Sequence, residues 1–184
     1  MALGATIHKA ALSVADIDRG HYADYSLTIA RHPSETGERM MMRLLAFALR
    51  ADAALTFGRG LSADDGPDLL RTDPTGEIDT WIDVGWPDGR RVRRACSRAR
   101  EVLVVTYGGA KAEAWWRQVR PALARCDHLE VIEVPADDAA ALARCARRAM
   151  QVHCSIQDGQ VLFACDDGEV AFEPVVLRTR LAQR

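Results

Sequence analysis

The chain has 184 residues and a formal net charge of -2, and 48% of its residues are hydrophobic, which fits one globular domain with a sizeable core. The near-neutral charge excludes a protein that attracts nucleic acid through its overall charge, so any basic surface must be local. No apolar stretch approaches the roughly 20 residues that a membrane-spanning helix needs, and we expect no membrane partner.

The first third of the chain predicts two strands and a helix. Residues 5–18 and 24–33 alternate in polarity, which predicts a hairpin or meander. Residues 32–52 (HPSETGERMMMRLLAFALRAD) predict a helix with Pro33 in its first turn. One helical stripe consists of Glu38, Met42, Leu45 and Leu49. The expected polar side of this helix consists of Glu35, Arg39, Arg43 and Arg50.

The rest of the chain alternates strands with helices. A short strand within residues 54–61 and a loop at 62–67 precede two strands around the turn DPTG at 73–76. Further elements follow in this order: a helix at 88–100, a buried strand at 101–108, a helix at 110–126 that Pro121 breaks or kinks, a buried strand at 129–135, a helix at 137–151 and a strand meander at 152–174. The sequence therefore predicts a single mixed α/β domain over residues 1–184, with extra strands at both ends of the chain.

Five cysteines lie along the chain without a CxxC pair: Cys96, Cys126, Cys145, Cys154 and Cys165. An odd number without metal-ligand spacing predicts free thiols in a reducing compartment, each packed as a small apolar residue. The N-terminal stretch MALGATIHKAALSV has no long apolar run behind a basic start, so we expect no signal peptide. These features together predict a cytoplasmic protein.

The strand at residues 78–85 carries acids on one face. Strict alternation places Asp79, Trp81 and Asp83 on the face opposite Ile82 and Val84. The simplest interpretation is that this face meets solvent. If DPTG is the hairpin turn, however, Asp68 lies almost opposite Asp83, at the roughly 5 Å spacing of cross-strand neighbours.

Two like charges at that spacing would repel each other unless a cation lies between them. Oxygen ligands favour Mg²⁺ or Mn²⁺, so Asp68 and Asp83 predict a divalent metal site. Asp79 lies roughly 13 Å from Asp83 along the strand and could share the same ion only across a bulge. Glu38 either reaches water at the edge of its stripe or points towards these acids.

A run of arginines follows the acidic strand in RRVRRACSRAR, residues 90–100. This pattern is typical of a solvated helix face, but it also suits phosphate, because the guanidinium fork matches phosphate oxygens. Metal-binding acids beside a guanidinium group make a phosphodiester-cleaving arrangement chemically sensible.

Four stretches carry a resemblance to a known family: MALGATIHKAALSVADIDRGHY, LTIARHPSETGERMMMRLLAFAL, IDTWIDVGWPDGRRVRRACSRA and SIQDG. On these stretches the chain resembles the bacterial YaeQ proteins over essentially its whole length. The resemblance implies a variant PD-(D/E)XK nuclease core, restriction-endonuclease-like, over about residues 33–135. That superfamily core has the order helix, three strands, helix, strand, which is also the order expected above.

The same resemblance suggests roles for particular residues. The superfamily signature implies Asp68 as the first acid, with Asp79 as its rival, then Asp83, and Glu38 as the acid of the first helix. Gly85 stands where the signature has a lysine. The resemblance suggests that Arg94 supplies the missing charge, whereas the helical wheel favours Arg93. Because arginine is a poor proton acceptor, it could stabilise charge in a transition state but could not easily activate water.

Three functions from different classes follow: a nuclease, a binding module and, if the core covers the acid face, a metal-free structural protein. The first is a Mg²⁺- or Mn²⁺-dependent nuclease or phosphodiesterase whose catalytic residues are Glu38, Asp68, Asp79, Asp83, Arg93 and Arg94, with Asp68, Asp79 and Asp83 as metal ligands. The second is a catalytically inactive module that retains the nuclease fold and binds nucleic acid or a protein.

Overall fold

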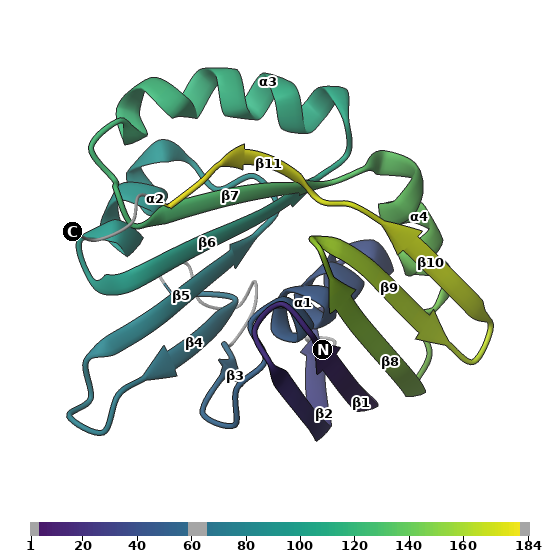
Figure 1. Ribbon diagram of the computed structural model, residues 1–184. Helices are drawn as coiled ribbons and strands as arrows, with labels where there is room; N and C mark the ends of the chain where they lie inside the picture. The colour runs from purple at the N-terminus through teal and green to yellow at the C-terminus, as the bar shows by residue number, and fades with distance from the viewer. Residues whose placement is uncertain (1–3, 59–65, 181–184) are drawn as a thin grey trace.

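Two β-sheets and four α-helices make up the described part of the chain in the computed structural model, residues 4–58 and 66–180 (Figure 1). The first sheet has five strands in the order β10-β9-β8-β1-β2: β1 (Thr6–Asp16), β2 (His21–Arg31), β8 (Ala149–Gln157), β9 (Gln160–Cys165) and β10 (Gly168–Phe172). The second sheet has six strands in the order β11-β7-β6-β5-β4-β3: β3 (Thr56–Phe57), β4 (Leu69–Thr72), β5 (Ile78–Val84), β6 (Ala99–Tyr107), β7 (Leu129–Val134) and β11 (Val175–Arg178). The helices are α1 (Gly37–Leu49), α2 (Gly89–Cys96), α3 (Ala110–Val119) and α4 (Ala136–Arg144).

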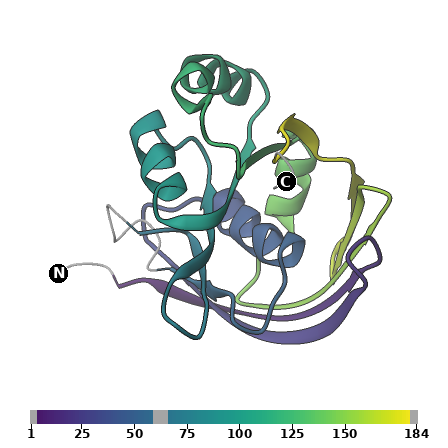
Figure 2. The same cartoon turned by 60° about the vertical axis from the view of Figure 1, so that its left-hand side comes forward.

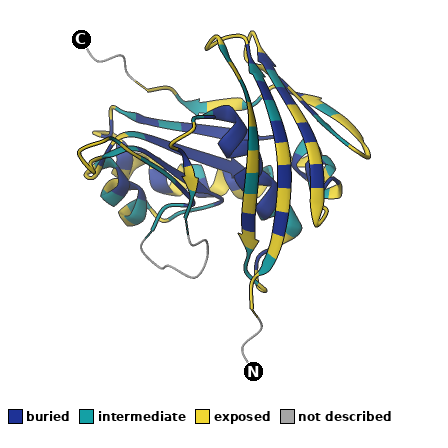
Figure 3. Cartoon of the chain, turned by 90° about the horizontal axis from the view of Figure 1, so that it is seen from below, coloured by how far each residue is buried: buried dark blue, intermediate teal, exposed yellow. Residues whose placement is uncertain are grey.

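The first sheet pairs strands from the N-terminal part of the chain with strands from its C-terminal part. The predicted hairpin of β1 and β2 and the predicted meander of β8, β9 and β10 are both confirmed, and β1 pairs with β8 in parallel. Buried and exposed residues alternate along these strands (Figure 3). The sheet thus covers the core with one face and meets solvent with the other.

In the second sheet, β5, β6 and β7 are parallel neighbours. Chain order places α2 between β5 and β6, and α3 between β6 and β7. A short 3-10 helix, Arg120–Leu123, follows α3, so the α-helix ends just before Pro121 as predicted. The carboxyl ends of the three parallel strands therefore lie at one edge of the sheet, together with the first turns of the helices that follow them.

Helix α1 lies between the two sheets (Figure 2). Its residues from Met40 to Leu49 are all buried, because side chains of one sheet pack on one side and those of the other sheet on the opposite side. The predicted polar side of this helix is therefore wrong for Arg43 and for Glu35 just before the helix, which are 0% and 2% exposed. Thr36 caps the helix through Arg39 N, so Pro33 precedes the first turn instead of lying in it.

A second core lies on the other face of the six-stranded sheet, where α2 and α3 pack on it. This core includes Trp81, Val102 and Val104 of the sheet, Val92 of α2 and Trp115 of α3. No helix within the described ranges is long and apolar enough to cross a membrane.

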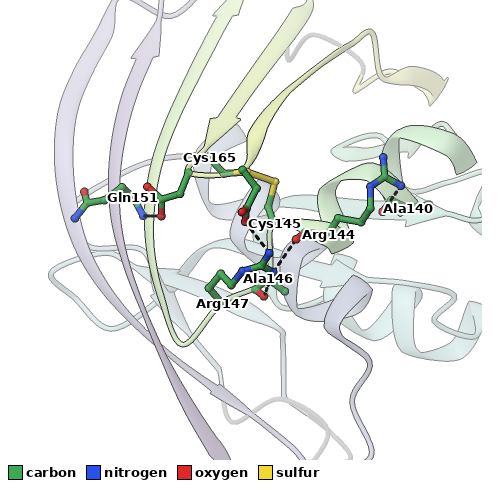
Figure 4. The surroundings of a disulfide bond; sticks show 9 residues. Ala140, Arg144, Cys145, Ala146, Arg147, Gln151 and Cys165 are labelled. Carbon is green, nitrogen blue, oxygen red and sulfur yellow. Dashed lines mark hydrogen bonds and ion pairs between the residues drawn. A yellow bond between two sulfur atoms is a disulfide. The ribbon is translucent and has the colours of Figure 1, made fainter.

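Two further predictions need correction. The helix expected over residues 137–151 ends at Arg144, since residues from Ala149 onward form β8. Cys145 and Cys165 form a disulfide, so the prediction that all five cysteines are free thiols is wrong for this pair (Figure 4). The two cysteines are 20 positions apart in the sequence, and no sequence pattern predicted that they form a bond. Cys96, Cys126 and Cys154 are free.

The buried ion pair of Glu35 and Arg43 gives the first testable prediction. Both side chains are fully buried, and the Arg43 Nη1 lies 3.1 Å from the Glu35 Oε2. Glu35→Ala should lower the free energy of unfolding by about 3–5 kcal/mol, because it leaves a guanidinium charge unpaired in the core. Urea denaturation with linear extrapolation measures this change. Glu130→Ala, which removes the half-exposed pair with Arg50, is the matched control and should cost at most about 1 kcal/mol. Equal costs in the two variants would contradict the prediction.

Candidate functional site

Asp68 and Asp83 are neighbours across β4 and β5. Leu69 pairs with Ile82 in the ladder, and the Asp68 N–H donates to the Ile82 carbonyl oxygen at 2.9 Å. The predicted placement of Asp68 beside Asp83 is therefore confirmed, although the register shifts nearer the DPTG turn. The two acids are only 3% and 1% exposed. Two neighbouring carboxylates are thus shielded from water, so each needs a cation or hydrogen-bond donors.

Arginine supplies the positive charge to both carboxylates. The Arg39 Nη2 donates to Asp68 Oδ1 and Oδ2 at 2.7 and 2.9 Å. Arg91 contacts Asp83 through two nitrogens, Nη2 to Oδ1 at 2.7 Å and Nε to Oδ2 at 3.0 Å. The backbone N–H of Val84 also donates to Asp68 Oδ2 at 2.7 Å. Every carboxylate oxygen of the acid pair thus accepts a hydrogen bond.

Burial raises the pKa of Asp83, Arg91 opposes that rise, and the nearby Asp68 carboxylate adds to it. The Asp68 carboxylate acts in this direction because a neighbouring negative charge disfavours ionisation of Asp83. The two arginine side chains are partly exposed, 16% for Arg39 and 26% for Arg91. The acids therefore form the buried floor of the site, and the arginines form its accessible part.

Local sequence sets the position of Arg91. Asp88 caps α2, and its Oδ1 accepts the backbone N–H groups of Arg90 and Arg91, each at 2.8 Å. The helix therefore begins directly after β5, and Arg91 lies in its first turn beside the strand end. Arg91 also donates to the Gly66 carbonyl oxygen at 2.6 Å, which connects α2 to the segment before Asp68. The helix cap was the signal in the sequence that could have identified Arg91.

Gly85 ends β5 in a conformation that suits glycine. Its φ is +102°, and its N–H donates to the Val105 carbonyl oxygen at 2.9 Å. A Cβ at this position would meet no atom within 4 Å. The position where the family resemblance expects a lysine is therefore open in space, but a side chain there would strain the backbone.

Three residues at the same edge were not predicted: Trp86, Tyr107 and Lys111. The Trp86 indole N–H donates to the Tyr107 carbonyl oxygen at 3.0 Å, and the two ring centroids are 4.8 Å apart. The Lys111 ammonium lies 3.4 Å from the centroid of the Trp86 ring. Burial is the main reason that the pKa of Tyr107 is raised to about 12, and nearby Glu38 also raises it. Glu38 is in the first turn of α1.

The remaining predicted residues are placed differently. Asp79 pairs with Arg71, which also contacts Asp52 at 2.8 Å, near the start of β5 and away from the acid pair. The register shifts between Arg71 and Thr72, so β5 has an irregularity at this point. Helix α1 shares a core with Ile82 and Val84, which alternate with Asp83 along the strand.

The arginine that contacts Asp83 is Arg91, which the sequence interpretation did not select. Arg93 is exposed and Arg94 is half-buried on the same helix. Arg91 is the third residue of α2, in its first turn, and the two arginines that the interpretation favoured follow it by two and three residues.

The donor set of the acid pair fits arginine better than a metal in this geometry. Within residues 4–58 and 66–180, no group of three or more His, Cys, Asp and Glu side chains is placed to hold a metal ion. Asp68 and Asp83 both use their oxygens on guanidinium and backbone donors. A divalent ion would have to displace these donors.

Comparison with known proteins identifies the family. The sequence profile described as YaeQ protein matches residues 1–174. The chain belongs to the YaeQ family. The YaeQ protein of Escherichia coli (strain K12) is 48% identical over 168 residues, which is 91% of this chain and 92% of that protein, and its Salmonella typhi counterpart is 47% identical over 162 residues, 88% and 89% of the two chains.

Solved structures of YaeQ proteins have the same fold. The crystal structure of YaeQ from Xanthomonas axonopodis pv. citri has a TM-score of 0.92 at 51% sequence identity, and the match covers 95% of this chain and 99% of that one. YaeQ from Pseudomonas syringae has a TM-score of 0.91 at 35% identity, with coverage of 95% and 97%. The mixed α/β architecture predicted for a YaeQ protein is therefore confirmed.

The ionisation of Asp83 gives the second testable prediction. Arg91→Gln should raise the pKa of Asp83 further, because Arg91 stabilises the carboxylate, whereas Asp68→Asn should lower it by removing a neighbouring negative charge. Titration of the Asp83 side-chain carbon by NMR measures both changes against the wild type. Shifts in the same direction in both variants would show that the two carboxyl groups do not interact as described.

Proposed function

We propose that this protein binds the phosphodiester backbone of nucleic acid through Arg39 and Arg91, and that Asp68 and Asp83 hold the two guanidinium groups in place. The observation that carries the proposal is the pairing of each surface-reaching arginine with a buried carboxylate. Arginine suits phosphate because its planar fork offers several N–H donors. A side chain already fixed by a partner loses less entropy when it binds a ligand.

Charge on α2 supports the same proposal. The helix GRRVRRAC contains four arginines and no acid, and its only close acidic neighbour in sequence is the capping Asp88. Arg90 and Arg93 are exposed, and Lys111 lies at the same edge on α3. Positive charge is therefore concentrated here in a chain whose net charge is -2, which suits local binding of a polyanion.

Hydrolysis of a phosphodiester by a Mg²⁺- or Mn²⁺-dependent YaeQ protein is the second candidate. Two observations favour it: the neighbouring Asp68 and Asp83, and the element order α1, β3, β4, β5, α2, β6, which matches the helix, three strands, helix, strand order of a PD-(D/E)XK core. The metal would need Arg39 and Arg91 to leave the carboxylates, and no lysine stands at Gly85. These requirements make binding the first proposal and hydrolysis the second. A cytoplasmic location stays part of both.

Binding of an oligonucleotide tests the first proposal. Fluorescence anisotropy with a short labelled oligonucleotide should show weaker binding for Arg39→Gln and Arg91→Gln, because each variant loses a phosphate contact. The slope of log K against log salt should become shallower by about one for each variant. Arg93→Ala and Arg94→Ala test the residues that the family resemblance and the helical wheel favoured.

Arg144→Ala is the matched control, since Arg144 is exposed on α4 and its side chain donates only a long bond of 3.5 Å to the Ala140 carbonyl oxygen. Circular dichroism establishes that each variant is folded. If all variants bind like the wild type, or the wild type binds no nucleic acid at physiological salt, the proposed function is wrong.

Calorimetry with Mn²⁺ tests the second candidate separately. If a metal competes with arginine for the acid pair, Arg91→Gln should bind Mn²⁺ more tightly than the wild type, and Asp83→Asn should bind it more weakly. The same proteins are assayed for Mn²⁺-dependent cleavage of the oligonucleotide. Identical heats for all three proteins would remove the metal from this site.

A further inference from the structure

The disulfide connects the two halves of the fold (Figure 4). Cys145 is the C-terminal cap of α4, which follows the last parallel strand of the six-stranded sheet, and Cys165 ends β9 in the other sheet. The Cys145 side is buried, whereas Cys165 is partly exposed next to the exposed Asp166 and Asp167. Of the two cysteines, Cys165 is therefore the one that a small thiol would approach from solution.

A chain of contacts leads from this bond to the candidate site. Ala146 follows Cys145, and its Cβ would lie 3.8 Å from a Cβ placed on Gly37. Gly37 is the first residue of α1, and Arg39 two residues later binds Asp68. The corner after α4 thus packs directly on the turn that presents Arg39.

We propose that Cys145 and Cys165 form a reversible redox site whose reactant is a small thiol and its disulfide, and that closing the bond fixes the first turn of α1. A thiolate attacks the Cys165 sulfur, the S–S bond breaks, and Cys145 leaves as a thiolate that takes up a proton. A second thiol resolves the mixed disulfide. In total, two small thiols are oxidised to one disulfide and the protein disulfide is reduced to two thiols, with two electrons transferred.

Contacts beside the bond keep the two cysteines near each other when it is open. Arg147 forms an ion pair with Asp167 at 2.8 Å, and each of these residues lies two positions after one of the cysteines. His8 of β1 contacts the Arg147 carbonyl oxygen at 2.7 Å through Nδ1. The opened thiols therefore stay within reach, which allows the bond to form again.

A redox titration tests the chemistry. The wild-type protein is equilibrated in mixtures of reduced and oxidised glutathione, quenched by alkylation and mapped by mass spectrometry. The Cys145–Cys165 peptide link should be lost and regained across the series, while Cys154→Ser, which changes a buried free thiol, should follow the wild-type curve. Reduction should also lower the melting temperature by about 5–10 °C, as expected for a bond closing a loop of this size.

The effect on the site is measured without any nucleic acid, so its result does not depend on the proposed function. In ¹H–¹⁵N spectra, the signals of the Gly37 amide and the Arg39 Nε–H should shift on reduction, and Cys165→Ser should show the reduced positions in any buffer. The Arg71 Nε–H, which belongs to β4, should stay constant. If the bond fails to form in oxidised glutathione, or the Gly37 and Arg39 signals do not move, the proposal is overturned.

Discussion

The arrangement of this site depends on a chain of ion pairs that runs from the core to the surface. Arg43 and Glu35 are fully buried, Glu35 also accepts from Arg39 at 3.0 Å, and Arg39 in turn binds Asp68. Taking four charges out of water is costly unless each is paired and hydrogen-bonded. Any shift of α1 along its axis would break several of these pairs at once, so the network fixes the helix in one register between the two sheets.

Parallel strands determine where the site lies. The strands β5, β6 and β7 all end at one edge, and the glycines that follow β5 and β6, Gly85 and Gly108, have φ values near +100°. The chain turns sharply at these positions, and α2 and α3 begin close to the strand ends. The first turns of these helices, which are far apart in the sequence, therefore lie at the same edge together with their charged residues.

Local patterns predicted the fold well, while contacts between distant segments remained hidden. The alternation in β5 and the DPTG turn were sufficient to place Asp68 beside Asp83, because both are properties of one hairpin. The burial of Arg43 was missed because a helical wheel cannot show that a second sheet covers the other side of α1. The parallel pairing of β1 with β8 and the Cys145–Cys165 bond join segments that are distant in the sequence. No local sequence pattern reveals such contacts.

The acid pair has a different physical meaning once its partners are known. From sequence, two neighbouring acids implied a missing cation, and a metal was the simplest one. The structure supplies that cation twice from within the chain, through Arg39 and Arg91. Burial raises the pKa of Asp83, and Arg91 opposes this rise, so the arginine favours the ionised carboxylate while the carboxylate holds the arginine in place. Because the carboxylate already orients the guanidinium group, the arginine side chain loses little further conformational entropy when it binds an anion.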